Sequence, residues 1–221
     1  MMSCPLTSAQ AWSAALHASE QRLRGLVSDM HKDWLASWGG GVWTHQRLTN
    51  AWRDLASAFS VDSPPFSELA DPMLRIALLP PEEVYRVLVI RALLPRLAQV
   101  RTCIDPLQRS KLISAVGNPA LQVLVSEGRE VLTSMADKGL PNVSELAWEG
   151  YQLFAKDGRW QDKEGLARLL RLRFPREGAP LYAQVSDPSA SRWVLERLPL
   201  FVKEQPWWYD STGMIFMLTW N

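Results

Sequence analysis

Three histidines stand at equal intervals in this chain, a pattern that raises the question of a metal site. His17, His31 and His45 are separated by 14 positions each, and 14 residues of straight helix rise about 21 Å. Zinc binds histidine nitrogens at about 2 Å, so His17 and His31 cannot share one ion on a continuous helix. His45 follows a glycine turn and would have to fold back to meet either of them. We therefore expect surface or helix-capping histidines and no metal-binding residues.

The cysteines and carboxylates give no catalytic pattern either. Cys4 and Cys103 are the two cysteines of the chain, and their separation fits no metal spacing, which favours reduced thiols in a reducing compartment. Glu82 and Glu83 are adjacent, so on a helix they point about 100° apart. Carboxylates in a first helical turn are explained by the helix dipole alone.

Linear motifs of catalysis are also missing from the sequence. It contains no glycine-rich phosphate loop, no Gly-x-Ser-x-Gly elbow and no His-Glu-x-x-His. We expect no catalytic residues, no cofactor and a protein that is not an enzyme. A site assembled from distant residues leaves no linear trace, so an enzyme without a motif stays an alternative.

The densest basic cluster accompanies a helix predicted from about Asp162. Its members are Arg168, Arg171, Arg173 and Arg176. One interpretation is a solvated face with cations placed favourably at a helix C-terminus. The other is a binding surface for an acidic partner segment. Nucleic acid is disfavoured because no aromatic residues are interleaved and the net charge is only +1.

Tryptophan is unusually frequent, with 11 in 221 residues. Most are expected to anchor helices to a core, since each ring buries about 200 Å². The others are candidate contact residues, because tryptophan is enriched at the energetic centres of protein interfaces. Together with the arginine cluster, Trp207 and Trp208 are the predicted partner-binding residues.

Bulk composition indicates one globular protein outside the membrane. Hydrophobic residues make up 47% and charged residues 21%, which is ordinary for a folded domain. No apolar run approaches the roughly 18 residues of a membrane span, and no signal peptide is evident. We expect a cytoplasmic, single helical domain over residues 1–221. Its core is expected at about 66–175, followed by a proline-rich, irregular portion at about 176–221.

Helical periodicity runs through the chain and predicts an all-α fold with short loops. We expect a long amphipathic helix over about 7–37 and a second from Thr44, as N-cap, to near Ser60. Pro80 and Pro81 open a central helix whose segment 84–94 is apolar apart from Arg86 and Arg91, which form its polar edge.

After the central helix, prolines and glycines punctuate a series of short helices. Pro95 is expected to kink or end the helix, with Leu97, Val100 and Ile104 continuing its apolar stripe. Asp105-Pro106 starts the next helix, and its predicted buried residues are Leu107, Leu112, Ile113 and Val116. Gly117-Asn118-Pro119 ends that helix and starts one that runs past Met135 to Gly139.

The last third of the sequence combines clear helix starts with an unusual tail. Asn142 to Glu145 fits a capping box, Asp157-Gly158 a turn, and Asp187-Pro188 a further helix start. The apolar tail after Trp207 suits an extended segment or hairpin docked on the body or covered by a partner.

Four short segments of the central region resemble, in their order, the SctK/YscK family of type III secretion accessory proteins. They are residues 77–81 (ALLPP), 87–94 (VLVIRALL), 100–105 (VRTCID) and 112–117 (LISAVG). The resemblance covers about residues 69–135 and transfers no binding residue.

The resemblance implies a non-catalytic, all-helical cytoplasmic adaptor of the sorting platform. Its implied partners are the cytoplasmic domain of the inner-membrane ring protein (SctD class) and the pod protein (SctQ class), which would place it at the membrane periphery, not inserted. A second function class stays open: a helical chaperone or regulator that binds a partner helix in a groove.

Overall fold

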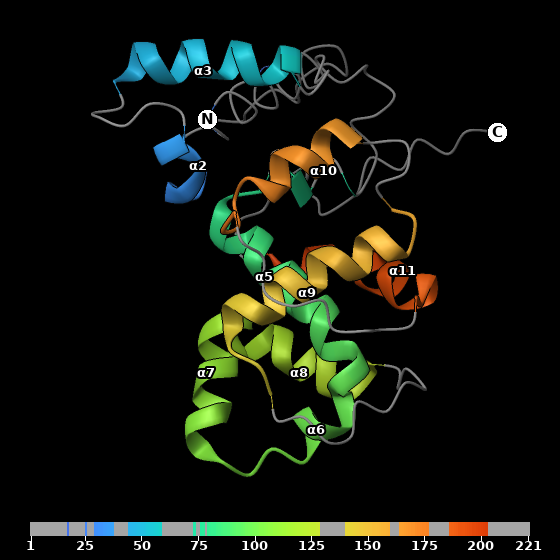
Figure 1. Cartoon of the computed structure of the whole chain (residues 1–221). Helices are drawn as coiled ribbons and strands as arrows, with labels where there is room; N and C mark the ends of the chain where they lie inside the picture. Colours follow the sequence, from blue (N-terminus) through green and yellow to red (C-terminus); the bar gives the residue numbers. More distant parts are fainter. Residues whose placement is uncertain are drawn as a thin grey trace, which may run out of the picture.

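The computed structural model is mostly helical in the residues that it describes (Figure 1). The described residues are 17, 25, 29–37, 44–58, 73, 76–77, 79–128, 140–159, 164–176 and 186–202. No strand occurs among them, so the all-α fold class is confirmed. Within the same residues, no helix is long and apolar enough to cross a membrane.

Helix α5, Pro81–Leu93, lies at the centre and packs mainly against α9, Val143–Lys156. Pro81 occupies its first turn with Glu82 and Glu83, as the sequence predicted. The two helices approach closely at Gly150, where an added Cβ would lie 1.9 Å from the carbonyl oxygen of Leu88. Glycine is therefore required at this crossing by space.

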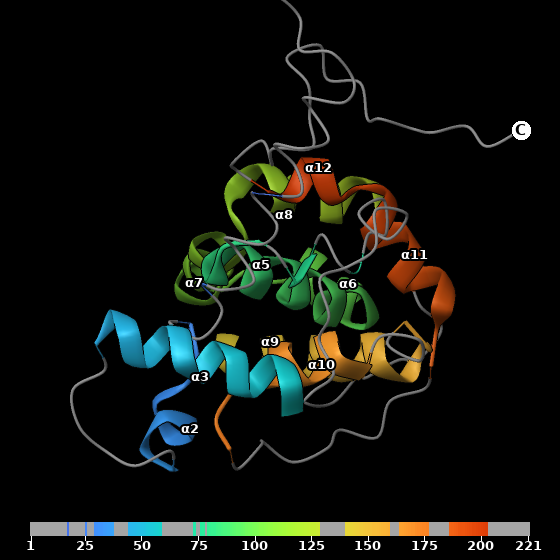
Figure 2. The same cartoon turned by 90° about the horizontal axis from the view of Figure 1, so that it is seen from above.

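The predicted polar edge of α5 does not face water. Arg86 is 6% exposed and Arg91 is completely buried, so the predicted polar edge lies inside the protein. Figure 2 shows α8 and α12 on one side of α5 and α9 and α10 on the other. Helices thus cover the arginines as well as the apolar residues.

Each buried arginine of this region is paired with a carboxylate. Arg91 donates to Asp157 at 2.7 Å and to the Ser191 hydroxyl at 2.8 Å. Arg86 pairs with Glu83, one turn earlier on the same helix. Arg96 pairs with Glu149 of α9. An isolated buried charge is very costly, so α5 can pack in the core only because its arginines are paired with carboxylates.

After α5 the chain kinks and forms three short helices. Pro95 lies in the 3-10 turn η2, Leu94–Arg96, and α6, Leu97–Arg101, follows with a changed direction. Helix α7, Pro106–Val116, is capped by the Asp105 side chain. Gly117, with φ of 83°, links α7 to α8, Asn118–Glu127. These predicted helix starts and stops are confirmed.

Two details of this region differ from the sequence prediction. Ile104 is 92% exposed and Leu107 is 64% exposed, although both were expected to be buried. Helix α6 ends at Arg101, so its apolar stripe does not reach Ile104. Helix α8 ends at Glu127, with the backbone of Gly128 bonded to Leu124, so the predicted continuation from α8 to Met135 is wrong.

The second half of the described chain contributes helices to both sides of α5. Asn142 and Glu145 form the predicted capping box of α9, and Gly158 makes the predicted turn with φ of 71°. Helix α10 is Glu164–Arg171. Helix α11, Pro188–Glu196, is capped by Asp187 and is followed by α12, Leu198–Phe201, which contacts α5 and α8.

Near the N-terminus the structure describes α2, Lys32–Ser37, and α3, His45–Ala58. Thr44 accepts from the Arg47 backbone as the predicted N-cap of α3. The single helix predicted over about 7–37 is wrong at residues 29–31, which are not helical. There the His31 N–H donates to the Leu172 carbonyl at 2.8 Å, a long-range bond that replaces a helical one.

The histidine predictions hold for two of the three residues. His17 is exposed, and the His31 Nδ1 accepts from the backbone of Asp33 in the first turn of α2. The side chain of His45, the glycine turn at 39–41 and the tail from residue 203 lie outside the described residues.

We predict that Gly150→Ala destabilises the protein by about 3 kcal/mol or prevents folding, because backbone atoms at the α5–α9 crossing must move apart. Gly25→Ala is the matched control, since a Cβ there meets nothing within 4 Å. Urea denaturation followed by circular dichroism measures both. Equal stability of Gly150→Ala and the unmodified chain would contradict the described crossing.

A second prediction concerns the buried Arg91–Asp157 pair. Asp157→Asn should cost about 3 kcal/mol, because it leaves Arg91 charged and buried. Adding Arg91→Met to this variant should recover part of the loss. In the exposed Arg197–Glu127 pair, Glu127→Gln should cost less than about 1 kcal/mol. A double-mutant cycle in urea gives the coupling energy; strictly additive effects would show that the pair does not hold α5 in place.

Candidate partner-binding surface

The turn that follows α10 builds an aromatic cluster. Phe174 is 1% exposed, and its ring lies 5.4 Å from those of Tyr85 and Trp148 and 5.7 Å from that of Tyr151, centroid to centroid. Trp148 and Tyr151 stack on one another along α9. The Trp34 indole N–H donates to the Phe174 carbonyl at 2.9 Å, which attaches α2 to this turn.

Arg171, at the end of α10, lies between two indole rings. Its guanidinium carbon is 4.4 Å from the centroid of Trp148 and 5.4 Å from that of Trp34. It also donates to the carbonyls of Pro175 at 2.7 Å and Arg176 at 2.8 Å. Burial lowers the pKa of Arg171, and the nearby Tyr151 partly offsets this effect. Arg171 therefore stabilises the turn itself.

The other three predicted arginines are placed differently. Arg173 is 3% exposed, and its guanidinium lies 3.0 Å from the Asp29 carboxylate. It is therefore buried, although the sequence placed it outside or at the end of the helix. Arg168 and Arg176 are exposed, and Arg176 lies 5.8 Å from the Trp34 ring centroid. Trp207 and Trp208 lie outside the described residues.

We call the half-buried Trp34, Trp148 and Arg171, with the exposed Arg168 and Arg176, the arginine–tryptophan surface. Tryptophan, tyrosine and arginine are the residues that dominate interface energetics. Sequence reasoning found the arginines but not the two indoles, which are far apart along the chain. The only early signal was residue type, since tryptophans as a class were expected either to anchor helices or to form contacts.

Buried ionisable groups elsewhere are engaged in structure. Burial raises the pKa of the Glu149 carboxyl, and the hydrogen bond from Arg96 lowers it in part. Burial likewise raises the pKa of Tyr85, whose hydroxyl donates to the Arg173 carbonyl. Among the described residues, no group of three or more His, Cys, Asp or Glu side chains has the arrangement to hold a metal ion.

Comparison with known proteins decides the family. The sequence model of the bacterial type III secretion protein HrpB4 matches residues 6–204 of the 221. The chain belongs to the HrpB4 family. HrpB4 is the SctK/YscK-type family, so the resemblance seen in the central segments is confirmed, and the protein has its role in type III secretion.

The HrpB4 match is much wider than residues 69–135, where the resemblance was recognised from the sequence. It takes in α2 and α10, and so the whole arginine–tryptophan surface. It ends before Trp207 and Trp208. No curated protein and no solved structure matches the chain.

We predict that Arg171→Ala destabilises the protein by about 2 kcal/mol, because two cation–π contacts and the hydrogen bonds to the turn are lost together. Arg192→Ala, at an exposed position of α11, is the control and should stay within about 0.5 kcal/mol. Thermal unfolding measures the difference. Equal melting temperatures for the two variants would show that Arg171 has no structural part in the turn.

Proposed function

We propose that this protein is a non-catalytic cytoplasmic adaptor of a type III secretion system, acting as a single helical domain. It links the inner-membrane ring protein (SctD class) to the pod protein (SctQ class) of the sorting platform, at the cytoplasmic face of the apparatus. The observation that carries the proposal is the family match over residues 6–204. The described residues support it by offering contact surfaces and by using their buried charges for packing.

The arginine–tryptophan surface is the proposed contact with one of these two partners. Arg168 and Arg176 supply exposed positive charge, and the exposed parts of the half-buried Trp34 and Trp148, whose ring faces lie against Arg171, supply apolar area beside it. A complementary partner surface carries carboxylates around an apolar centre. Trp207 and Trp208 remain proposed contact residues on the basis of residue type alone.

The structure dictates which substitutions test this contact. Charge reversal at Arg171 would disturb the turn, and at Arg173 it would leave Asp29 facing another carboxylate. Arg168→Glu combined with Arg176→Glu changes exposed positions only. Arg192→Glu and Arg53→Glu together impose the same charge change on exposed positions of α11 and α3.

We predict that the purified full chain binds the ring protein's cytoplasmic domain and the pod protein, both from the same bacterium, in one ternary complex. Arg168→Glu with Arg176→Glu should weaken one of the two binary complexes by about tenfold or more, because two complementary charges become repulsive. Size-exclusion chromatography with light scattering and titration calorimetry give stoichiometry and Kd. Melting temperature confirms that the variant is folded.

Three results would contradict the proposal. Binding to neither platform component would remove the adaptor role. An equal loss of affinity in the Arg192→Glu, Arg53→Glu control would show that only net charge matters and would remove the contact assigned to this surface. A stoichiometric complex with a small secreted or regulatory protein in place of both components would favour the chaperone class.

A further inference from the structure

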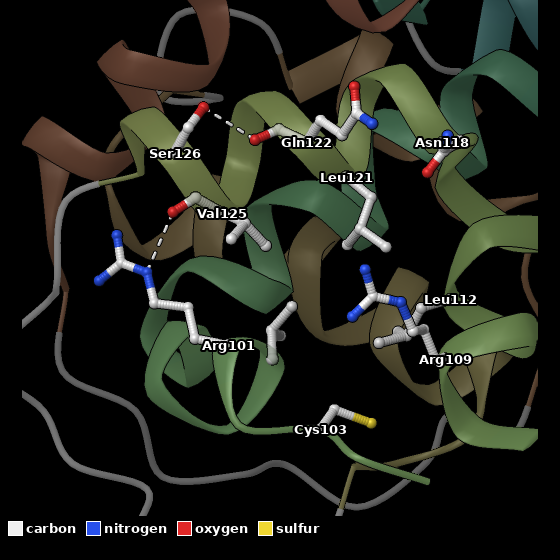
Figure 3. A pocket seen from close by; sticks show the side chains of 10 residues that line it. Arg101, Cys103, Arg109, Leu112, Asn118, Leu121, Gln122, Val125 and Ser126 are labelled. Carbon is white, nitrogen blue, oxygen red and sulfur yellow. Dashed lines mark hydrogen bonds between the residues drawn. The ribbon is translucent and has the colours of Figure 1, made fainter. Parts of the chain in front are cut away.

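A pocket of about 260 Å³ lies between α6, α7 and α8 (Figure 3). Figure 1 shows α6 and α7 below the α5–α9 pair and α10 above it, so the pocket is remote from the arginine–tryptophan surface. Leu112, Leu121 and Val125 contribute apolar wall, and Arg101, Cys103 and Arg109 contribute polar atoms. Pockets for small molecules usually have volumes of about 300–1,000 Å³. This smaller cavity suits one or two side chains of a protein segment.

The lining of the pocket is positive. It contains two arginines and no carboxylate. Arg101 donates to the carbonyls of Val125 at 3.0 Å and Gly128 at 3.1 Å, so it fixes the end of α8 against α6. Two carboxylates lie near the lining in sequence. Glu127 pairs with Arg197 at 3.1 Å, and Asp105 caps α7. An entering group of negative charge therefore meets no like charge in the lining.

Arg109 is an exposed residue of α7 that lines the pocket. In Figure 3 its guanidinium points into the cavity, toward Leu121. None of the described residues accepts a hydrogen bond from this guanidinium or pairs with it. A guanidinium offers two parallel donors that match a carboxylate. Arg109 is thus placed to receive an acidic side chain from outside the chain.

Exposed apolar residues stand beside the pocket in a turn that is already ordered. Ile104, 92% exposed, directly follows the lining residue Cys103, and Leu107 is 64% exposed on the first turn of α7. The Thr102 hydroxyl donates to the Ala98 carbonyl at 2.9 Å, and the Asp105 cap fixes the start of α7. A turn held this way loses little conformational freedom on binding.

We propose that the α6–α8 pocket binds a short segment of a partner protein that carries an apolar side chain next to a carboxylate. The apolar side chain enters between Leu112, Leu121 and Val125, and the carboxylate pairs with Arg109. Ile104 and Leu107 contact the flanking apolar residues of the same segment. This site goes beyond the proposed adaptor role, since it specifies the chemistry of the bound segment whichever protein carries it.

The test uses the full chain with Cys4→Ser, which leaves Cys103 as the only thiol. The probe is a fluorescein-labelled short peptide in which leucine and glutamate are adjacent. The comparison peptide has glutamine at every glutamate position. Fluorescence anisotropy measures Kd, and the rate of Cys103 alkylation by N-ethylmaleimide reports whether the pocket is covered.

The glutamate peptide should bind about tenfold or more tightly than the glutamine peptide and should slow alkylation of Cys103. Arg109→Glu should weaken its binding by at least about tenfold, and Arg109→Gln by less. The matched control Arg192→Glu should change Kd by less than about twofold, because Arg192 is exposed on α11. Far-UV circular dichroism confirms that the variants are folded.

Several outcomes would overturn the proposal. These are no binding of the glutamate peptide, equal binding of both peptides, equal losses for Arg109→Glu and Arg192→Glu, or unchanged alkylation of Cys103 in the complex. Faster alkylation after removal of residues 203–221 would make the chain's own tail the occupant. A dimer that Arg109→Glu dissociates would make it a second copy. The test uses peptides alone, so its failure leaves the ring-and-pod proposal untouched.

Discussion

The burial of three arginines at the centre of the fold is the constraint on which the rest of the structure depends. Arg86, Arg91 and Arg96 each require a carboxylate, because a lone buried guanidinium is far more costly than any packing gain. Glu83 comes from the same helix, but Glu149 and Asp157 come from α9 and the turn after it. The pairs therefore set the register of α9 on α5, and Gly150 permits the close approach that this register demands. Asp157 also accepts from Ser186 and Ser191, so the same charge attaches the start of α11.

This central pairing determines where partner contacts are available. Trp148 and Tyr151 lie on the face of α9 that meets the turn after α10, where Phe174 and Arg171 complete an aromatic and cationic surface. At the other end of the body, the Pro95 kink turns α6 away from α5 and lets α7 and α8 enclose a small basic pocket. Two basic surfaces with apolar neighbours thus stand on opposite sides of one buried pair of helices.

Local signals made most helix limits predictable from the sequence. Proline at the first turn of α5, aspartate caps of α7 and α11, the capping box of α9 and Gly117 all act within a few residues, so no tertiary information is needed.

Several of the predictions that failed concern the burial of particular side chains. Arg91 and Arg173 were expected at a polar edge or outside a helix by their charge, but carboxylates far along the chain allow their burial. Ile104 was assigned to the core by periodicity after its helix had ended. Of the candidate surfaces, the sequence supplied the arginine cluster, whereas the places of Trp34, Trp148 and Arg109 beside them are evident only in the fold.

The central claim is that partners bind at the two surfaces and leave the arginine-paired core unchanged. Hydrogen–deuterium exchange of the full chain, alone and with the ring protein's cytoplasmic domain and the pod protein, tests it most directly. We expect slower exchange in residues 164–176, in residues 101–126 or in both, and no change in residues 84–94, whose amides are already protected by burial. Altered exchange confined to residues 84–94 and their partners on α9, with both surfaces unaffected, would contradict the claim.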